Sequence, residues 1–166
     1  MAKTIRINGI SADTIDAAVQ ELRRYADWVE QKETELRSRL ASRGATVASI
    51  QFARAIYNGV NDVSVRVDDT GSVAVIYAEG ESVAFIEFGS GKQYGYGHPQ
   101  AGEHGLGPGT WSDGPDGKGH WENPKGWWYG HGQHSYGNPP AMAMYNAVQA
   151  MTEDITQIAR EVFGSA

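Results

Sequence analysis

Residues 63–88 read VSVRVDDTGSVAVIYAEGESVAFIEF, and this stretch decides the fold class. At its start, Val63, Val65 and Val67 alternate with polar residues, which is the pattern of a half-buried strand. Residues 68–71, Asp-Asp-Thr-Gly, combine the residue types that favour a tight turn. The opening of this stretch therefore predicts a strand that ends in a turn.

The remainder of the stretch predicts two more strands. Residues 73–78 are apolar at every position, as expected for a central strand, and residues 79–81 (Glu-Gly-Glu) predict another turn. Residues 83–88 form a third apolar run of strand length. Because both connections are short, we expect an antiparallel β-meander.

The segment before this stretch has the period of helices. Ser11 or Asp13 is a suitable N-cap for a long amphipathic helix that ends before Gly44. A second helix is predicted at 46–57, and residues 4–7 alternate like a short edge strand. The apolar positions of the long helix recur at steps of three and four, with Glu33 interrupting: Ile15, Val19, Leu22, Ala26, Val29, Leu36 and Leu40. Its other face is heavily charged and is either solvated or a subunit contact.

A further helix is predicted at the end of the chain. Asn138 is a suitable N-cap, and Pro139 would occupy the first helical position. The apolar residues that follow step by four and three, and we expect them to pack on the sheet: Met144, Val148, Met151, Ile155, Ile158 and Val162. The expected fold class is α+β, an antiparallel β-meander packed by N-terminal helices and a C-terminal helix, in one domain over residues 1–166.

Residues 89–137 differ in composition from the rest of the chain. They hold 15 of the 21 glycines, four of the five tryptophans and all five histidines, but no phenylalanine or isoleucine. This is a long Gly/Trp/His-rich insertion within the domain, too long for an ordinary connection between two elements. Disordered segments are poor in aromatic residues, so we interpret the insertion as functional.

Overall composition excludes several classes of protein. A hydrophobic content of 40% argues against a disordered chain, and no apolar run approaches the roughly 20 residues of a membrane span. Residues 1–6 show no secretory signal pattern, so we expect no export by that route. The net charge of −6 argues against tight, sequence-independent phosphate binding, and the absence of cysteine excludes disulfides and thiolate ligands.

No motif in the chain predicts an enzyme. His131 and His134 are three residues apart, but they lie in glycine-rich sequence without the helical framework of a zinc site. Residues 113–117 (Asp-Gly-Pro-Asp-Gly) lack calcium-loop spacing, and residues 89–92 (Gly-Ser-Gly-Lys) lack the hydroxyl residue of a phosphate loop. We therefore expect no catalytic residues, no metal and no cofactor.

Aromatic side chains in the insertion are the candidate binding residues. Tryptophan and tyrosine on turn-rich sequence are typical of protein interfaces, but they also occur in carbohydrate platforms and in local aromatic clusters. Of these three readings we favour a protein interface. The residues expected to form it are Trp111, Trp121, Trp127, Trp128, Tyr129 and Tyr136, together with Glu87, Phe88 and Gly89 at the start of the insertion.

Two segments carry a resemblance to a known family. EFGSG at 87–91 and GNPPAMAMYNA at 137–147, in this order of predicted elements, resemble the tail-completion and neck proteins of long-tailed bacteriophages. Residues 109–121, GTWSDGPDGKGHW, look like an insertion carried by relatives in prophages of Gram-positive bacteria. The resemblance spans nearly the whole chain, and the length of the insertion is its main departure from the family pattern.

The resemblance implies a structural virion protein and no reaction. Such proteins form a homo-oligomeric ring, with six copies expected, at the head–tail interface, where they contact head-closure and tail-tube or terminator proteins. The ring assembles in the host cytoplasm, genomic DNA passes through it without specific binding, and no membrane is involved. An acidic chain suits a channel that does not grip phosphate.

The alternative function is a carbohydrate-binding or cell-wall-binding module that uses the aromatic residues of the insertion. Glycan binding by the isolated protein would favour that alternative, and ring formation would favour the neck protein. We further predict that residues 89–137 are the main contact surface between subunits or with an adjoining ring. Their glycine content makes ordering them costly, so we expect them to be loosely ordered in the free monomer.

Overall fold

The computed structural model describes residues 11–55, 61–91, 97–100, 103, 125–129 and 132–164. Helices and strands both occur, and the paired strands are antiparallel, so the predicted α+β class is confirmed. The edge strand predicted at 4–7 lies outside the described residues. In chain order the elements are α1 (Ala12–Arg54), β1 (Ser64–Asp68), β2 (Val75–Glu79), α2 (Val83–Phe88), β3 (Trp127–Tyr129), β4 (Gln133–Ser135) and α3 (Ala143–Gly164).

One continuous helix of 43 residues, α1, stands where two helices were predicted. Ser11 caps it as expected, in a reciprocal capping box with Thr14. The predicted break at Gly44 is wrong, because Gly44 lies inside the helix and is buried. A Cβ built on Gly44 would lie 2.6 Å from both Ile76 Cδ1 and Met151 Sδ. This glycine therefore allows two other elements to approach α1 closely.

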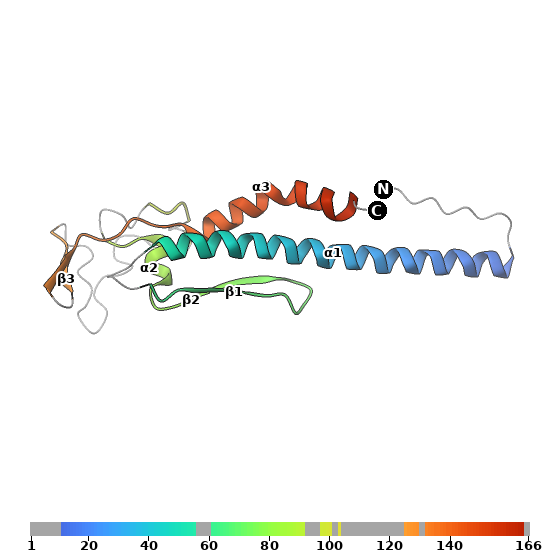
Figure 1. The fold of residues 1–166 in the computed structure, drawn as a ribbon, viewed down its shortest axis with the longest axis horizontal. Coiled ribbons are helices and arrows are strands. Elements are labelled where there is room, and N and C mark those ends of the chain that lie inside the picture. Colours follow the sequence, from blue (N-terminus) through green and yellow to red (C-terminus); the bar gives the residue numbers. More distant parts are fainter. Residues whose placement is uncertain are drawn as a thin grey trace.

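Helix α3 runs antiparallel to α1 along its side (Figure 1). Ion pairs of Arg43 with Asp154 and of Arg39 with Glu161 link the two helices. Near the end of α3, the ring of Phe163 packs edge-on against Trp28, with centroids 6.0 Å apart. The prediction that this helix packs on the sheet needs correction, since its main partner is α1.

The predicted apolar stripe of α3 is only partly buried. Val162 is fully buried, while Val148 and Ile155 remain 51% and 44% exposed. The apolar stripe of α3 is wider than the surface that α1 can cover. The outer edge of the stripe is therefore left on the surface.

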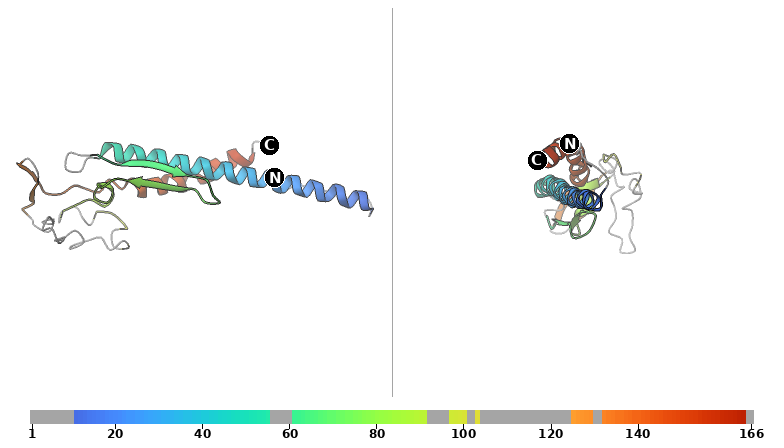
Figure 2. Two further views of the ribbon diagram at one scale, coloured as in Figure 1. Left: turned by 90° about the horizontal axis from the view of Figure 1, so that it is seen from below. Right: turned by 90° about the vertical axis from the view of Figure 1, so that its right-hand side faces the viewer.

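Strands β1 and β2 form a hairpin that lies along α1 (Figure 2). Their antiparallel register pairs Val65 with Ala78 and Val67 with Ile76. Beyond the end of β1, Asp69 accepts hydrogen bonds from Arg37 Nε, at 2.7 Å, and from the hydroxyl of Ser38. Both donors lie on α1, so the turn of the hairpin is attached to the long helix.

The third strand predicted at 83–88 is wrong, because these residues form the short helix α2. Asp62 accepts hydrogen bonds from the backbone N–H groups of Glu81, at 2.6 Å, and Ser82, at 3.2 Å. These bonds lie in the turn between β2 and α2, where the chain leaves the hairpin. A short apolar run does not by itself distinguish a buried strand from a buried helix.

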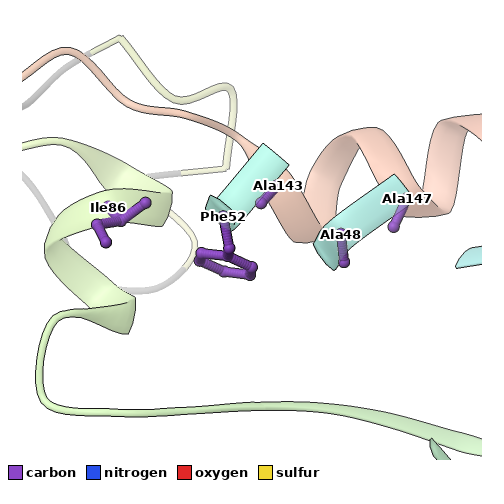
Figure 3. Packing of buried hydrophobic residues seen from close by; sticks show 5 residues of the cluster. All are labelled: Ala48, Phe52, Ile86, Ala143 and Ala147. Atoms are coloured by element: carbon purple, nitrogen blue, oxygen red, sulfur yellow. The ribbon is translucent and has the colours of Figure 1, made fainter. Parts of the chain in front are cut away.

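The centre of the core lies where α1, α2 and α3 meet (Figure 3). Phe52 of α1 is 1% exposed and faces Ile86 of α2. Alanines line the contact between the two long helices, Ala48 from α1 and Ala143 and Ala147 from α3. Small side chains let helix axes approach, so α1 and α3 pack closely at this end of α1.

Candidate functional site

The two ends of the insertion are bound to each other. Ser90 and Asn138 form an isolated antiparallel bridge, in which each backbone N–H donates to the other carbonyl, at 2.9 and 3.1 Å. The Ser90 hydroxyl accepts a further hydrogen bond from the Asn138 N–H at 3.2 Å. We call residues 87–91 and 136–140 the stem of the insertion. Its two segments contain EFGSG and the beginning of GNPPAMAMYNA, the stretches on which the phage resemblance depends.

Close backbone contact makes glycine necessary in the stem. Gly137 has a φ of +103°, and a Cβ on it would lie 2.0 Å from the Ser90 carbonyl oxygen. Gly91 has a φ of +83°, and its Cβ would lie 2.5 Å from the Tyr136 carbonyl oxygen. Such φ values and such contacts exclude ordinary side chains. The glycines of EFGSG and GNPP thus have a structural role in closing the stem.

Glu87 of the stem caps helix α3. Its Oε2 accepts a hydrogen bond from the backbone N–H of Met144 at 2.8 Å, and its Oε1 accepts one from Tyr145 at 3.0 Å. The side chain is buried, and its negative charge lies at the positive end of the helix dipole. The prediction that Asn138 caps this helix is wrong, because α3 begins at Ala143 and Asn138 bridges to Ser90 instead.

His98, within the insertion, closes on the same carboxylate. Its Nε2 lies 3.2 Å from Glu87 Oε1, and its Nδ1 accepts a hydrogen bond from the Gln100 backbone N–H at 3.0 Å. An Nδ1 that accepts carries no proton, so the ring proton is assigned to Nε2, which donates to Glu87. The rings of Phe88 and Tyr145 pack on the imidazole, at centroid distances of 4.5 and 5.5 Å. His98 therefore fastens the first part of the insertion to the scaffold.

Strands β3 and β4 form a small antiparallel hairpin, and β3 lies beyond the end of α1 and the start of α3 (Figure 1). Trp128 pairs with His134 across the hairpin, and their rings meet edge-on at 4.8 Å. The ring of Tyr136 contacts His134 in the same way at 4.6 Å. Trp128 is 72% exposed and Tyr136 is 60% exposed. We call these three residues the aromatic row, which displays two large side chains to solvent.

The structure brings together some of the predicted interface residues. Trp128 and Tyr136 share the aromatic row, and Trp127 and Tyr129 lie in β3 beside them. Trp111 and Trp121 lie outside the described residues, as does most of the insertion whose loose ordering was predicted. Glu87 is only 4% exposed, and Phe88 packs on His98, so these two residues support the stem from within.

His98 is the functional residue that sequence reasoning did not single out. It was grouped with the other histidines of the insertion, and its partner Glu87 is 11 residues away, a spacing with no motif attached. In the part of the chain that the structure describes, no group of three His, Asp or Glu side chains could hold a metal ion. The stem is held by hydrogen bonds and ring packing, an arrangement suited to fixing the position of the insertion on the scaffold.

Comparison with known proteins found no match among family models, curated proteins or solved structures. Within the described residues, no helix is both long and apolar enough to cross a membrane. Any functional assignment therefore depends on the geometry of the stem and the aromatic row, together with the resemblance of the sequence segments.

Proposed function

We propose that this protein is a structural subunit of the head–tail junction of a long-tailed bacteriophage, acting in tail completion or in the neck. One observation carries the proposal. The two segments with the phage resemblance, EFGSG and GNPP, hydrogen-bond to each other at Ser90 and Asn138 and close the stem. A resemblance spread over two distant segments gains weight when those segments form one structural unit.

The form of the molecule supports an assembly role. The core lies near one end of α1, and the insertion leaves the scaffold at that same end (Figure 1). The aromatic row presents Trp128 and Tyr136 there, and these residue types dominate protein–protein hot spots. We propose that this end contacts a neighbouring protein of the head–tail junction.

A ring of identical subunits is part of the proposal, with DNA passing through it. A closed ring of identical subunits needs two different complementary surfaces on each copy. The net charge of −6 suits a channel wall that does not retain the phosphate backbone. No reaction is assigned to the chain.

The double variant Trp128→Ala with Tyr136→Ala tests the proposal. Both side chains are exposed, so we expect the thermal unfolding midpoint to stay within about 2 °C, as for surface changes of less than 0.5 kcal/mol. Negative-stain microscopy and light scattering of the purified protein, alone and with tail-tube protein, should show rings that are lost or detached from tubes in the variant. Tyr77→Ala is a matched control, because Tyr77 is an exposed aromatic on β2.

Carbohydrate binding remains the second candidate, because an exposed tryptophan beside an exposed tyrosine can also stack on sugar rings. Calorimetric titration of the purified protein with cell-wall glycan fragments distinguishes the two. Saturable glycan binding that the double variant loses, in a protein that forms no rings, would replace the proposed function with the alternative.

A further inference from the structure

A series of hydrogen bonds continues from Glu87 through His98 into the insertion. His98 Nε2 donates to Glu87 Oε1 at 3.2 Å, and the backbone N–H of Gln100 donates to His98 Nδ1 at 3.0 Å. The carbonyl of Gln100 in turn accepts from the backbone N–H of Glu103 at 3.1 Å. One imidazole ring thus connects Gln100 and Glu103 to the scaffold.

The surroundings of this ring are closed and contain other titratable groups. His98 is 4% exposed and packs against the rings of Phe88 and Tyr145. The titratable side chains that contact it are Glu87 from α2 and Tyr145 from α3, and the exposed carboxylate of Glu103 follows on the insertion. Glu87 also accepts hydrogen bonds from two backbone N–H groups of α3, so it meets the ring as an acceptor.

Both nitrogens of the ring are occupied, one as a donor and one as an acceptor. A neutral imidazole has one N–H and one acceptor nitrogen, whereas the imidazolium has two N–H groups and no acceptor. A proton on Nδ1 of His98 would point at the N–H of Gln100, so their hydrogen bond cannot exist in the charged state. The bond from Nε2 to Glu87 is kept and becomes charge-assisted. Protonation therefore removes one contact of the ring and strengthens the other.

We propose that His98 is a pH-sensitive switch, which holds Gln100 when the ring is neutral and releases it when the ring is protonated. Histidine is the side chain whose charge ordinarily changes between about pH 5 and pH 8. The ring stays on Glu87 in both states, so α3 keeps its cap. What moves is the backbone from Gln100 onward, within the insertion. This inference goes beyond the proposed function, since it holds whatever the insertion contacts.

Amide hydrogen exchange, measured for single residues by NMR, tests the switch. The intrinsic exchange rate at each pH is divided by the measured rate, which gives a protection factor without the ordinary pH dependence of exchange. Between about pH 8 and pH 5, the range in which histidine titrates, we expect the protection of the Gln100 amide to fall by about tenfold, as for the loss of one hydrogen bond. The amide of Met144, which is bonded to Glu87, should stay protected throughout.

Two substitutions distinguish the two nitrogens of the ring. His98→Asn places an amide oxygen near the position of Nδ1, and asparagine readily accepts from the N–H two residues on, so Gln100 should be protected at both pH values. His98→Gln can donate to Glu87 from its amide nitrogen but has no acceptor near Nδ1, so Gln100 should be unprotected at both. His134→Gln, in the aromatic row, is the control and should keep the pH dependence.

Three results would overturn the proposal. The first is a Gln100 amide that stays protected in acid although the nitrogen chemical shifts of His98 show a protonated ring. The second is a fall in protection that persists in His98→Asn, because another group would then cause it. The third is a joint loss at Gln100 and Met144, which would mean that acid opens the cap of α3 instead. If either variant fails to fold, the titration of the natural protein decides by itself.

Discussion

Glu87 caps helix α3 through Met144, although the two residues are 57 positions apart, with Oε2 2.8 Å from the backbone nitrogen. The same carboxylate accepts from Tyr145 and from His98, so one buried side chain joins α2, α3 and the insertion. The placement of the stem on the scaffold depends on this carboxylate.

Glu87→Ala should lower the free energy of unfolding by about 2–4 kcal/mol. It leaves two backbone N–H groups and the imidazole N–H without their acceptor, and hydrogen bonds to a charged group contribute about 1.5–3 kcal/mol. Glu87→Gln keeps an acceptor oxygen and should cost less. Urea unfolding measures both, with Glu153→Gln on the exposed face of α3 as the control. Equal stability of Glu87→Ala and the control would contradict the capping role.

Gly137→Ala should destabilise the stem by about 2–4 kcal/mol. Its Cβ would overlap the Ser90 carbonyl oxygen, a backbone atom that cannot move without breaking the bridge to Asn138. Gly132→Ala is the matched control. Gly132 also has a positive φ, +74°, but no atom lies within 4 Å of the built Cβ, so only the conformational cost of about 1 kcal/mol applies. Similar losses for the two variants would show that the close contact has no effect.

Gly44→Ala should change stability by no more than about 1 kcal/mol, whereas Gly44→Leu should cost about 2–4 kcal/mol. Alanine gains up to about 1 kcal/mol of helix propensity, and its Cβ meets only the flexible ends of Ile76 and Met151. Leucine would have to displace both side chains. Thermal unfolding followed by circular dichroism compares them. A strong loss for Gly44→Ala would mean instead that Ile76 and Met151 cannot move away from the added Cβ.

Stability should fall between pH 5 and pH 3. Hydrogen bonds from the Ser38 hydroxyl and the Arg37 guanidinium lower the pKa of Asp69, and those from Gln157 and Arg39 lower the pKa of Glu161. With a folded pKa below the unfolded one, the unfolded chain takes up protons first as pH falls. The stabilisation is therefore complete above the unfolded pKa and is lost as pH drops through the folded pKa.

Unfolding midpoints at a series of pH values measure this slope. Asp69→Asn should be less stable than the natural chain at pH 6 and should show a shallower fall below about pH 4. Asp16→Asn, near the start of α1, serves as the control and should keep the original slope. If the unfolding midpoint of Asp69→Asn falls with pH as steeply as that of the natural chain, the hydrogen bonds of Asp69 to α1 are not a source of the acid sensitivity.

Local patterns determined most of the elements. The period of three and four residues predicted helical structure in both regions, although it divided α1 in two. Ser11 or Asp13 predicted the start of α1, and residues 68–71 predicted the turn of the hairpin. These features depend on neighbours within a few residues along the chain, because caps, turns and helical faces are local. The composition of residues 89–137 likewise predicted the insertion, and the structure then showed that its two ends are hydrogen-bonded to each other.

Other features of the fold were decided by contacts between residues that are distant along the chain. The chain before 83–88 is held by Asp62 from the other side of the hairpin, and Gly44 lies inside α1 where Ile76 and Met151 pack against it. The cap of α3 came from Glu87, since no nearby residue supplies that acceptor. A short apolar run or a single glycine is compatible with more than one local structure. The choice is made by the packing and hydrogen bonds of residues that only the folded chain brings together.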